Sequence, residues 1–440
     1  MNAFIDYPLT VMNSLKNEIK SMAISASEYA EDPARNFKRK RKIGFVDLIT
    51  FLIVIGNSNT EIELNRYFDY NVDAIPRSSA FIQQRSKLKL YALRYLLKAF
   101  NDKFPLTLYR NKYNLIAVDG CEFNIFRNAG DPETYYEPSG KTTLGYNMIH
   151  TIPLFDVISK RYLDIEFQPG RLKNEFQAYC NLVDRYENDV QPIFIADRGF
   201  ASYNTFAHTI EAKHKFLMRA KDLNIKRYLN LSELPDTMDQ IVTLILTHSQ
   251  NKKKRLQPHK SDQYRKICKK VSFDFIDDNR TEYELSFRVV RFDLGNGNFE
   301  NIVTNLSEDE FSAEDLKDIY WLRWKIETSF RDLKHTIGTE NFHSKSVKFV
   351  SQEILARMIL FNFSTIIISH SVIKKYGKKH VHQVNFSMAM KLCIDYLSSN
   401  GKIDSSKILI NKYTLPVREG RKYLRRHRFR PPVSFCFKFF

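Results

Sequence analysis

The chain has 440 residues, 43% of them apolar and 13% aromatic, so it can bury a large core and form more than one domain. Lysine and arginine outnumber the acids by 68 to 50, and the formal charge of +18 indicates a polyanion or an acidic membrane surface as partner, with nucleic acid favoured. The five cysteines are far apart and form no Cys-x-x-Cys pair, which argues against a disulfide framework or a zinc cluster. The most apolar runs are short or carry polar residues, so we expect a cytoplasmic protein without a membrane partner.

The first hundred residues predict an all-helical domain over 1–108. Apolar spacing indicates helices over 46–55 and 60–68 and a longer one from 79 to about 104. Three short helices can form a DNA-reading unit, and basic residues occur before the first helix and on the third. A solvated helical face is an equal alternative for the third helix. The candidate DNA contacts here are Arg39, Lys40, Arg41 and Arg85.

From residue 114 the hydrophobic period changes to that of strands. An apolar strand over 115–118 ends at Asp119, and two further strands, 148–157 and 162–167, are joined by a turn at Ser159 and Lys160. After a helix over 174–186, a buried strand over 193–196 ends at Asp197. A helix over 202–212 and a strand over 216–219 follow, so strands and helices alternate as in a mixed α/β protein.

About eighty residues then interrupt this regularity, and we interpret 221–300 as a mostly β insertion. Strand-forming residues at 283–293 and 301–305 flank a turn signal at 295–298. A basic run within the insertion contains Lys253 and Lys254, and a basic tail contains Arg421 and Arg425. Charge runs are usually only solvated, but separate basic clusters along one chain favour a long DNA track.

Four polar residues after the insertion share one side of a helix. Tyr320, Arg323, Glu327 and Lys334 are spaced by three, four and seven residues, which places them in one stripe at about 100° per residue. A separate apolar stripe on the same segment anchors that helix to a core; it comprises Leu322, Ile326, Phe330 and Leu333.

Three carboxylates are candidate catalytic and metal-binding residues, namely Asp119, Asp197 and Glu327. Each aspartate ends a strand and precedes a short glycine-containing turn, so its side chain can project from an open strand end. Taken singly, such an aspartate is more often a turn or helix cap. Together they would supply the oxygen ligands that Mg²⁺ or Mn²⁺ requires, and two such ions per site can cut a phosphodiester.

These motifs resemble those of a DDE transposase of the insertion-sequence-four type. Its Tyr-x2-Arg-x3-Glu-x6-Lys signature is matched without a gap, and the resemblance covers nearly the whole chain. It extends to the segments 116–120, 195–200, 303–306 and 385–387.

The resemblance implies a ribonuclease-H-like mixed-sheet core over 109–220 and 301–385, interrupted by the β insertion. It also implies that 1–108 binds double-stranded transposon ends and that the helical, basic region 386–440 serves a homodimer. The three carboxylates would form the metal triad, while Tyr320, Arg323 and Lys334 would contact the DNA backbone near the cut. Arg323 suits a bidentate phosphate contact.

The reaction implied is cut-and-paste transposition, in which freed 3′ ends join target DNA. Hairpin-forming relatives stack a base on a tryptophan in the β insertion, where this chain has Phe299. Phe299 offers a π face for stacking and is equally compatible with a place in the core. Two alternatives stay open, namely a non-catalytic DNA-binding protein derived from such an enzyme and a structure-selective nuclease on the same fold.

Overall fold

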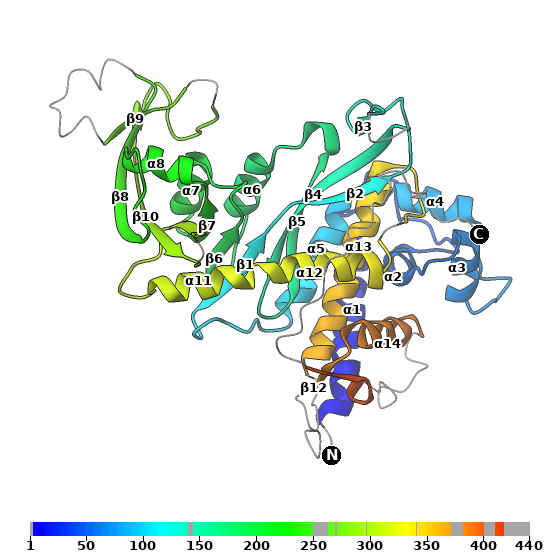
Figure 1. Ribbon diagram of the computed structural model, residues 1–440. Helices are drawn as coiled ribbons and strands as arrows, with labels where there is room; N and C mark the ends of the chain where they lie inside the picture. Colours follow the sequence, from blue (N-terminus) through cyan, green and yellow to red (C-terminus); the bar gives the residue numbers. More distant parts are fainter. Residues whose placement is uncertain are drawn as a thin grey trace.

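The computed structural model of the chain is shown in Figure 1. It describes residues 3–139, 144–249, 263–268, 271–295, 297–339, 341–370, 382–399 and 410–417. Within them the chain is a mixed α/β protein built on a large mixed sheet, as the sequence predicts.

The N-terminal segment forms five helices: α1 (Ala3–Ile24), α2 (Phe45–Val54), α3 (Thr60–Tyr67), α4 (Ser78–Ser86) and α5 (Leu90–Asp102). The predicted helices over 46–55 and 60–68 match α2 and α3. The long helix predicted from residue 79 is two helices, because the segment between them turns to pair with an earlier one and Lys89 N donates to Tyr29 O. Helix α1 was not predicted, although its buried residues have helical spacing; they are Val11, Met12, Leu15, Ile19 and Met22.

The centre of the sheet contains two parallel pairs and one antiparallel neighbour. Strand β1 (Tyr113–Val118) lies parallel to β6 (Gln191–Ala196), which lies parallel to β7 (Lys215–Ala220). On the other side β1 pairs antiparallel with β4 (Tyr146–Asp156). Strand β4 also pairs with β2 (Cys121–Ile125), β3 (Tyr135–Tyr136) and β5 (Arg161–Pro169).

Both faces of these central strands are buried, which explains their unbroken apolar sequence. Alternate residues of β1 belong to two different cores, with Leu115 and Ala117 on one face and Ile116 and Val118 on the other. Helices α6 (Glu175–Asp184) and α7 (Tyr203–Glu211) cover the second face. The first face shares one continuous core with the N-terminal helices.

The segment between β7 and residue 300 extends the same sheet. It contains α8 (Asp222–Leu229), β8 (Met238–Thr247), β9 (Tyr264–Lys266) and β10 (Glu282–Asp293), and β10 forms a hairpin with β11 (Phe299–Thr304). Because β11 pairs with β7, the sheet runs in the order β2-β4-β1-β6-β7-β11-β10-β8-β9. Gly295 and Gly297 in the hairpin turn have positive φ angles of 83° and 72°, a conformation that glycine adopts at no steric cost.

The remaining described elements are mostly helical. They are α11 (Ala313–Leu322), α12 (Trp324–Arg331), the π-helical turn η2 (Asp332–Thr336), α13 (Val347–Ser369), β12 (His382–Val384), α14 (Phe386–Ser398), η4 (Ile410–Lys412) and β13 (Thr414–Pro416), with a short turn η1 (Gly170–Leu172) earlier in the chain. Figure 1 shows α11 and α12 running in front of the sheet and α13 crossing behind them. Helix α13 is long and apolar enough to cross a membrane, but 94% of its most apolar stretch is buried inside the protein, so packing accounts for its composition.

Candidate active site

Asp119 and Asp197 leave the sheet side by side. They follow β1 and β6, two adjacent parallel strands whose last residues, Val118 and Ala196, are partners in the register. The carboxyl ends of parallel strands open at the same edge of a sheet, so both side chains emerge at one place. The structure thus brings together two candidate residues that are far apart in sequence.

Helices α11 and α12 deliver the third carboxylate and two further polar groups to this edge. The Tyr320 hydroxyl donates a hydrogen bond to Asp197 Oδ1 at 3.1 Å. Arg323 Nη1 donates to Asp119 Oδ2 at 3.1 Å, and Nη2 donates to Glu327 Oε1 at 3.2 Å. Asp119, Asp197 and Glu327 are therefore tied into one cluster by Tyr320 and Arg323.

A local break in the helix sets this geometry. The Arg323 N–H bonds to the Tyr320 carbonyl and the Ile326 N–H to the Arg323 carbonyl, which is the tighter spacing of a 3₁₀ turn. The predicted single helix is thus α11 followed by α12 and then by the π-helical turn η2. Such departures from regular helix are common at functional sites.

The cluster is partly withdrawn from water. Burial raises the pKa of Asp119 to about 6, while the nearby Arg323 opposes that rise and the carboxylates of Glu327 and Asp197 add to it. Arg323 is 3% exposed, and its Nε has no hydrogen-bond partner. Burial likewise raises the pKa of Tyr320.

The donor chemistry of the cluster fits a hard divalent cation, because three carboxylates supply only oxygen ligands. Within the described ranges, no three Asp, Glu, His or Cys side chains are close enough together to hold a metal ion. The guanidinium of Arg323 supplies the positive charge that balances Asp119 and Glu327 in this state. Asp119, Asp197 and Glu327 are the residues of this cluster that could serve as ligands of such a cation.

Lys334 forms no hydrogen bond or ion pair with Asp119, Asp197 or Glu327 within the described residues. It sits in the π-helical turn η2, where its Nζ donates to the Glu122 carbonyl at 2.8 Å and lies 5.0 Å from the centroid of the Phe123 ring. The wider turn moves Lys334 off the stripe that a regular helix would give. Its role as a DNA contact stays a prediction.

The sequence did not point to His150 and Glu175, which adjoin the cluster. A side chain on Gly120 would place its Cβ 2.8 Å from His150 Cε1 and 2.9 Å from Glu175 Oε1, so the turn after Asp119 has no room for any other residue. His150 is 2% exposed, and its Nε2 lies 3.2 Å from Glu175 Oε1. The only local signal was the glycine itself.

The prediction that Arg85 contacts DNA is wrong, because Arg85 is 1% exposed and cannot reach DNA in this structure. Its Nη1 pairs with Glu353 Oε1 at 3.0 Å, its Nε donates to Gln352 Oε1 at 2.9 Å, and its Nη2 donates to the Phe349 carbonyl. A fully occupied guanidinium on the core side of α4 joins the N-terminal helices to α13. The role of Arg85 is therefore structural.

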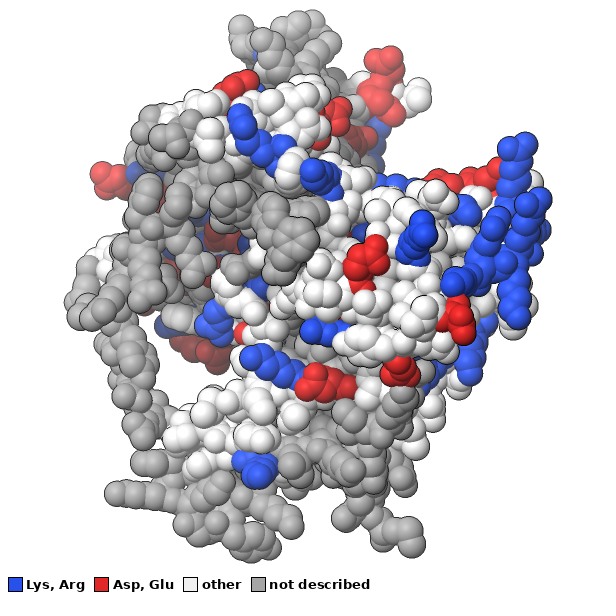
Figure 2. Space-filling model, turned by 90° about the vertical axis from the view of Figure 1, so that its right-hand side faces the viewer, with Lys and Arg blue, Asp and Glu red and all other residues white. Residues whose placement is uncertain are grey.

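The other predicted DNA contacts have different settings. Arg39, Lys40 and Arg41 are exposed in an irregular segment before α2. Phe299 begins β11 with the Arg291 guanidinium 4.4 Å from its ring centroid, so a cation already stacks on it. Lys and Arg side chains gather along one edge of the face in Figure 2. The DNA contacts predicted in the basic run of the insertion and in the basic tail lie outside the described residues. They are Lys253, Lys254, Arg421 and Arg425.

Comparison with known proteins identifies the family. The family model for the transposase DDE domain matches residues 110–363, which is more than half of the chain. The chain belongs to the transposase DDE domain family. All three carboxylates of the candidate site, together with Tyr320, Arg323 and Lys334, lie within the matched part of this family member.

Curated relatives match this DDE-family chain over a short segment. It is 36% identical over 58 residues to the transposase for insertion sequence element IS421 of Escherichia coli, and InsL of insertion sequence element IS186A in Escherichia coli strain K12 matches to the same extent. The match covers 13% of the chain and only 16% of each relative. Among solved structures, a piggyBac transposase synaptic complex with hairpin DNA aligns with 91% of this chain and 81% of its own, at 13% identity and a TM-score of 0.43.

Proposed function

We propose that the chain is a cut-and-paste transposase of the insertion-sequence-four type, with Asp119, Asp197 and Glu327 as its catalytic, metal-binding carboxylates. One observation carries the proposal: Arg323 and Tyr320 tie these three residues, from two strand ends and a helix, into one cluster. Membership of the transposase DDE domain family supports it. The order β5-β4-β1-β6-β7, with only β4 antiparallel to its neighbours, supports a ribonuclease-H-like core.

Divalent cations, Mg²⁺ or Mn²⁺ and two per site in this proposal, would supply Lewis acidity and a hydroxide-like nucleophile when bound. The protein holds the carboxylates in position. Tyr320 fixes the orientation of the Asp197 carboxylate, and the two strand ends hold both aspartates on rigid elements. The planar guanidinium of Arg323 can form bidentate hydrogen bonds with a phosphate as well as with carboxylates. In this proposal Arg323 exchanges its two carboxylate partners for a phosphate of the DNA backbone.

The DNA substrate in this proposal is the pair of terminal inverted repeats that bound the element. Hydrolysis at each end frees a 3′ hydroxyl, and the two ends are then joined to target DNA by a homodimer. Residues 1–108 bind the ends, and 386–440 contribute to the dimer contact. The exposed Arg39, Lys40 and Arg41 support an electrostatic contribution from the N-terminal part.

The test uses purified full-length protein and linear DNA that carries the element's own terminal repeats or a scrambled version of them. With Mg²⁺ or Mn²⁺ we expect nicking at the matched ends and joining of those ends to a plasmid. Asp119→Ala should abolish both and retain DNA binding. Cutting without regard to end sequence and without joining would instead establish a nuclease, and binding without any metal-dependent product would establish a non-catalytic DNA-binding protein.

A further inference from the structure

A hollow of about 520 Å³ lies beside the candidate active site, along the other side of α12. Helix α12, the turn between β4 and β5, and the starts of β12 and α14 contribute to its walls. Lys325, Thr328 and Asp332 line it at helical spacing, so one whole side of α12 and η2 faces this space. Within the described residues, none that lines the hollow forms a hydrogen bond or ion pair with Asp119, Asp197 or Glu327, so the hollow is distinct from the carboxylate cluster.

Positive charge dominates the walls. Lys160, Lys325 and Arg331 line the hollow, and the one acid among its lining residues is Asp332, which lies 3.8 Å from Arg331 Nε. Burial and the neighbouring charge of Lys160 lower the pKa of Lys325, and Asp156 opposes this shift only in part. Lys160 and Lys325 therefore repel each other, and an anion placed between them would relieve that repulsion.

The position of Arg331 links the hollow to the carboxylates. Arg331 follows Glu327 by four residues, so the two side chains are neighbours on α12, about 6 Å apart along the helix axis. Two base pairs of DNA rise by about 7 Å. A strand bound at the carboxylates and running along α12 would therefore bring a neighbouring phosphate to Arg331.

The apolar part of the wall suits a nucleotide. Phe386 lines the hollow, with Lys160 Nζ 5.8 Å from its ring centroid, and Thr328, Asn385 and Ser387 add polar side chains. A hydroxyl or amide can contact phosphate or sugar, and an aromatic edge can pack against a sugar or base. This combination of cations, hydroxyls and an aromatic ring is one that DNA-binding surfaces use.

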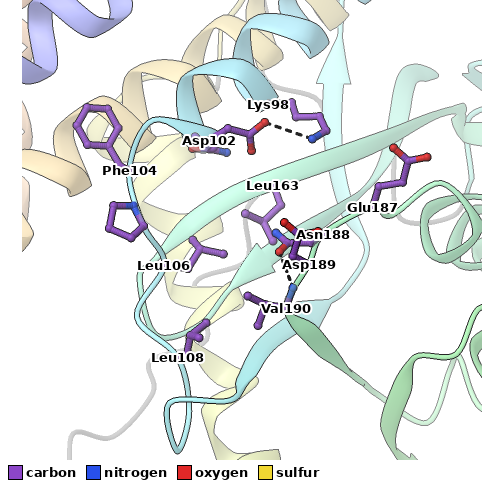
Figure 3. A pocket seen from close by; sticks show the side chains of 12 residues that line it. Lys98, Asp102, Phe104, Leu106, Leu108, Leu163, Glu187, Asn188, Asp189 and Val190 are labelled. Atoms are coloured by element: carbon purple, nitrogen blue, oxygen red, sulfur yellow. Dashed lines mark hydrogen bonds and ion pairs between the residues drawn. The ribbon is translucent and has the colours of Figure 1, made fainter.

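A second hollow offers the contrast. It has a volume of about 580 Å³ and lies between α5 and the loop before β6, with an apolar floor that includes Leu106, Leu108 and Leu163 (Figure 3). Its rim carries Asp102, Glu187 and Asp189, and its one lysine, Lys98, already pairs with Asp102 at 3.3 Å. That hollow would repel a polyanion.

We propose that the hollow beside α12 is a binding site for a DNA backbone phosphate, with Lys160 and Lys325 as its charged contacts and Arg331 joining it to the candidate active site. The phosphate belongs either to the transposon end next to the cut or to the target strand. This inference rests on the proposed function, because it assigns part of the DNA path to the same enzyme.

The experiment measures the salt dependence of binding for the full-length double variant Lys160→Asn, Lys325→Gln. Lys160 has a φ of 55°, a conformation that asparagine tolerates, so the substitution removes charge without backbone strain. Lys98→Gln, which removes one lysine charge from the contrasting hollow, is the control for charge lost away from the proposed site. Thermal unfolding establishes that each variant is folded.

Two binding arms distinguish the source of the phosphate. In the first arm, log K for binding to terminal-repeat DNA is measured against the logarithm of the salt concentration. The double variant should make this negative slope less steep by about 0.9, the value of one lost phosphate contact. Lys98→Gln should leave the slope unchanged. In the second, capture of target DNA by pre-cleaved ends is measured. A change in the first arm assigns the hollow to the transposon end, and a change in the second arm alone assigns it to the target.

The proposal is overturned if the double variant matches Lys98→Gln in both arms. Lys325→Arg, which keeps the charge, should bind like the wild type. Failure of the proposed activity gives a different result. If the wild type never cuts its ends, but the double variant still shows the smaller salt dependence, the proposed activity is refuted and the phosphate site stands.

Discussion

The guanidinium of Arg323 lies 3.1 Å from the carboxylate of Asp119, and this ion pair joins the helix α11–α12 to the end of β1. Arg323 also reaches Glu327, and its Cζ lies 4.8 Å from the centroid of the Trp324 ring. One buried cation thus balances two carboxylates in this state. Arg323 and a divalent cation would compete for the same oxygens.

Substitution of Arg323 should separate cation binding from catalysis. In Arg323→Gln we expect tighter Mn²⁺ binding in isothermal titration calorimetry, because the competing positive charge is gone. We also expect cleavage of end DNA to be slower by roughly tenfold or more, because each 1.4 kcal/mol of lost transition-state stabilisation is a factor of ten. Arg185→Gln is the matched control, since Arg185 also bridges two carboxylates, those of Asp164 at 2.7 Å and Glu166 at 2.6 Å, and both lie outside the candidate site. Weaker Mn²⁺ binding by Arg323→Gln would contradict the competition.

Tyr320→Phe removes only the hydroxyl that donates to Asp197. A hydrogen bond to a charged group contributes about 1.5–3 kcal/mol, so we expect the rate of strand cleavage to fall about 10- to 100-fold if Asp197 acts in the reaction. End-DNA binding, measured by fluorescence anisotropy, should change little because the ring remains. An unchanged cleavage rate would show that the Tyr320–Asp197 contact does not serve catalysis.

Arg85→Ala should unfold the protein more easily and leave DNA recognition alone. The side chains of Arg85 and Glu353 are each 2% exposed, and breaking a buried ion pair costs about 3–5 kcal/mol, because Glu353 then keeps only its contacts with His343 to offset its buried charge. The free energy of unfolding in urea measures this loss. Arg77→Ala, which changes an exposed arginine beside the same helix, should lower it by less than about 0.5 kcal/mol.

Asp156 should make folding stability depend on pH. Burial raises the pKa of Asp156 from 3.8 to about 6, with hydrogen bonds from Ser159 and Ile158 opposing the shift. Because the folded state binds this proton more tightly than the unfolded chain, the free energy of unfolding of the wild type falls by about 2.4 kcal/mol as the pH rises from 4 to 8. In Asp156→Asn that loss should be absent from unfolding curves at pH 4 and pH 8; equal pH dependence in both proteins would contradict the assignment.

The sequence predicted the parts of the site that depend on local pattern. Continuous apolar strands place Asp119 and Asp197 at strand ends, and the helical spacing of Tyr320, Arg323 and Glu327 puts them on one side of a helix. Both patterns arise from the geometry of single elements, so no tertiary information is needed.

What the sequence could not supply depends on long-range contacts. Arg85 looked like a surface cation, yet its buried partner Glu353 lies 268 residues away. The pairing of β11 with β7, which merges the insertion with the central sheet, also joins distant strands. The break at Arg323 and the π-helical turn at Lys334 are departures from a regular helix, and an ideal helix period does not predict them.

The most direct test of the account is a crystal structure of the full-length protein with its end DNA and Mn²⁺, with the metal located by anomalous scattering. We expect a peak for Mn²⁺ bonded to carboxylate oxygens of Asp119, Asp197 and Glu327, with Arg323 moved onto the DNA backbone. A DNA complex in which Mn²⁺ is bound elsewhere, and Arg323 still bridges Asp119 and Glu327, would contradict it.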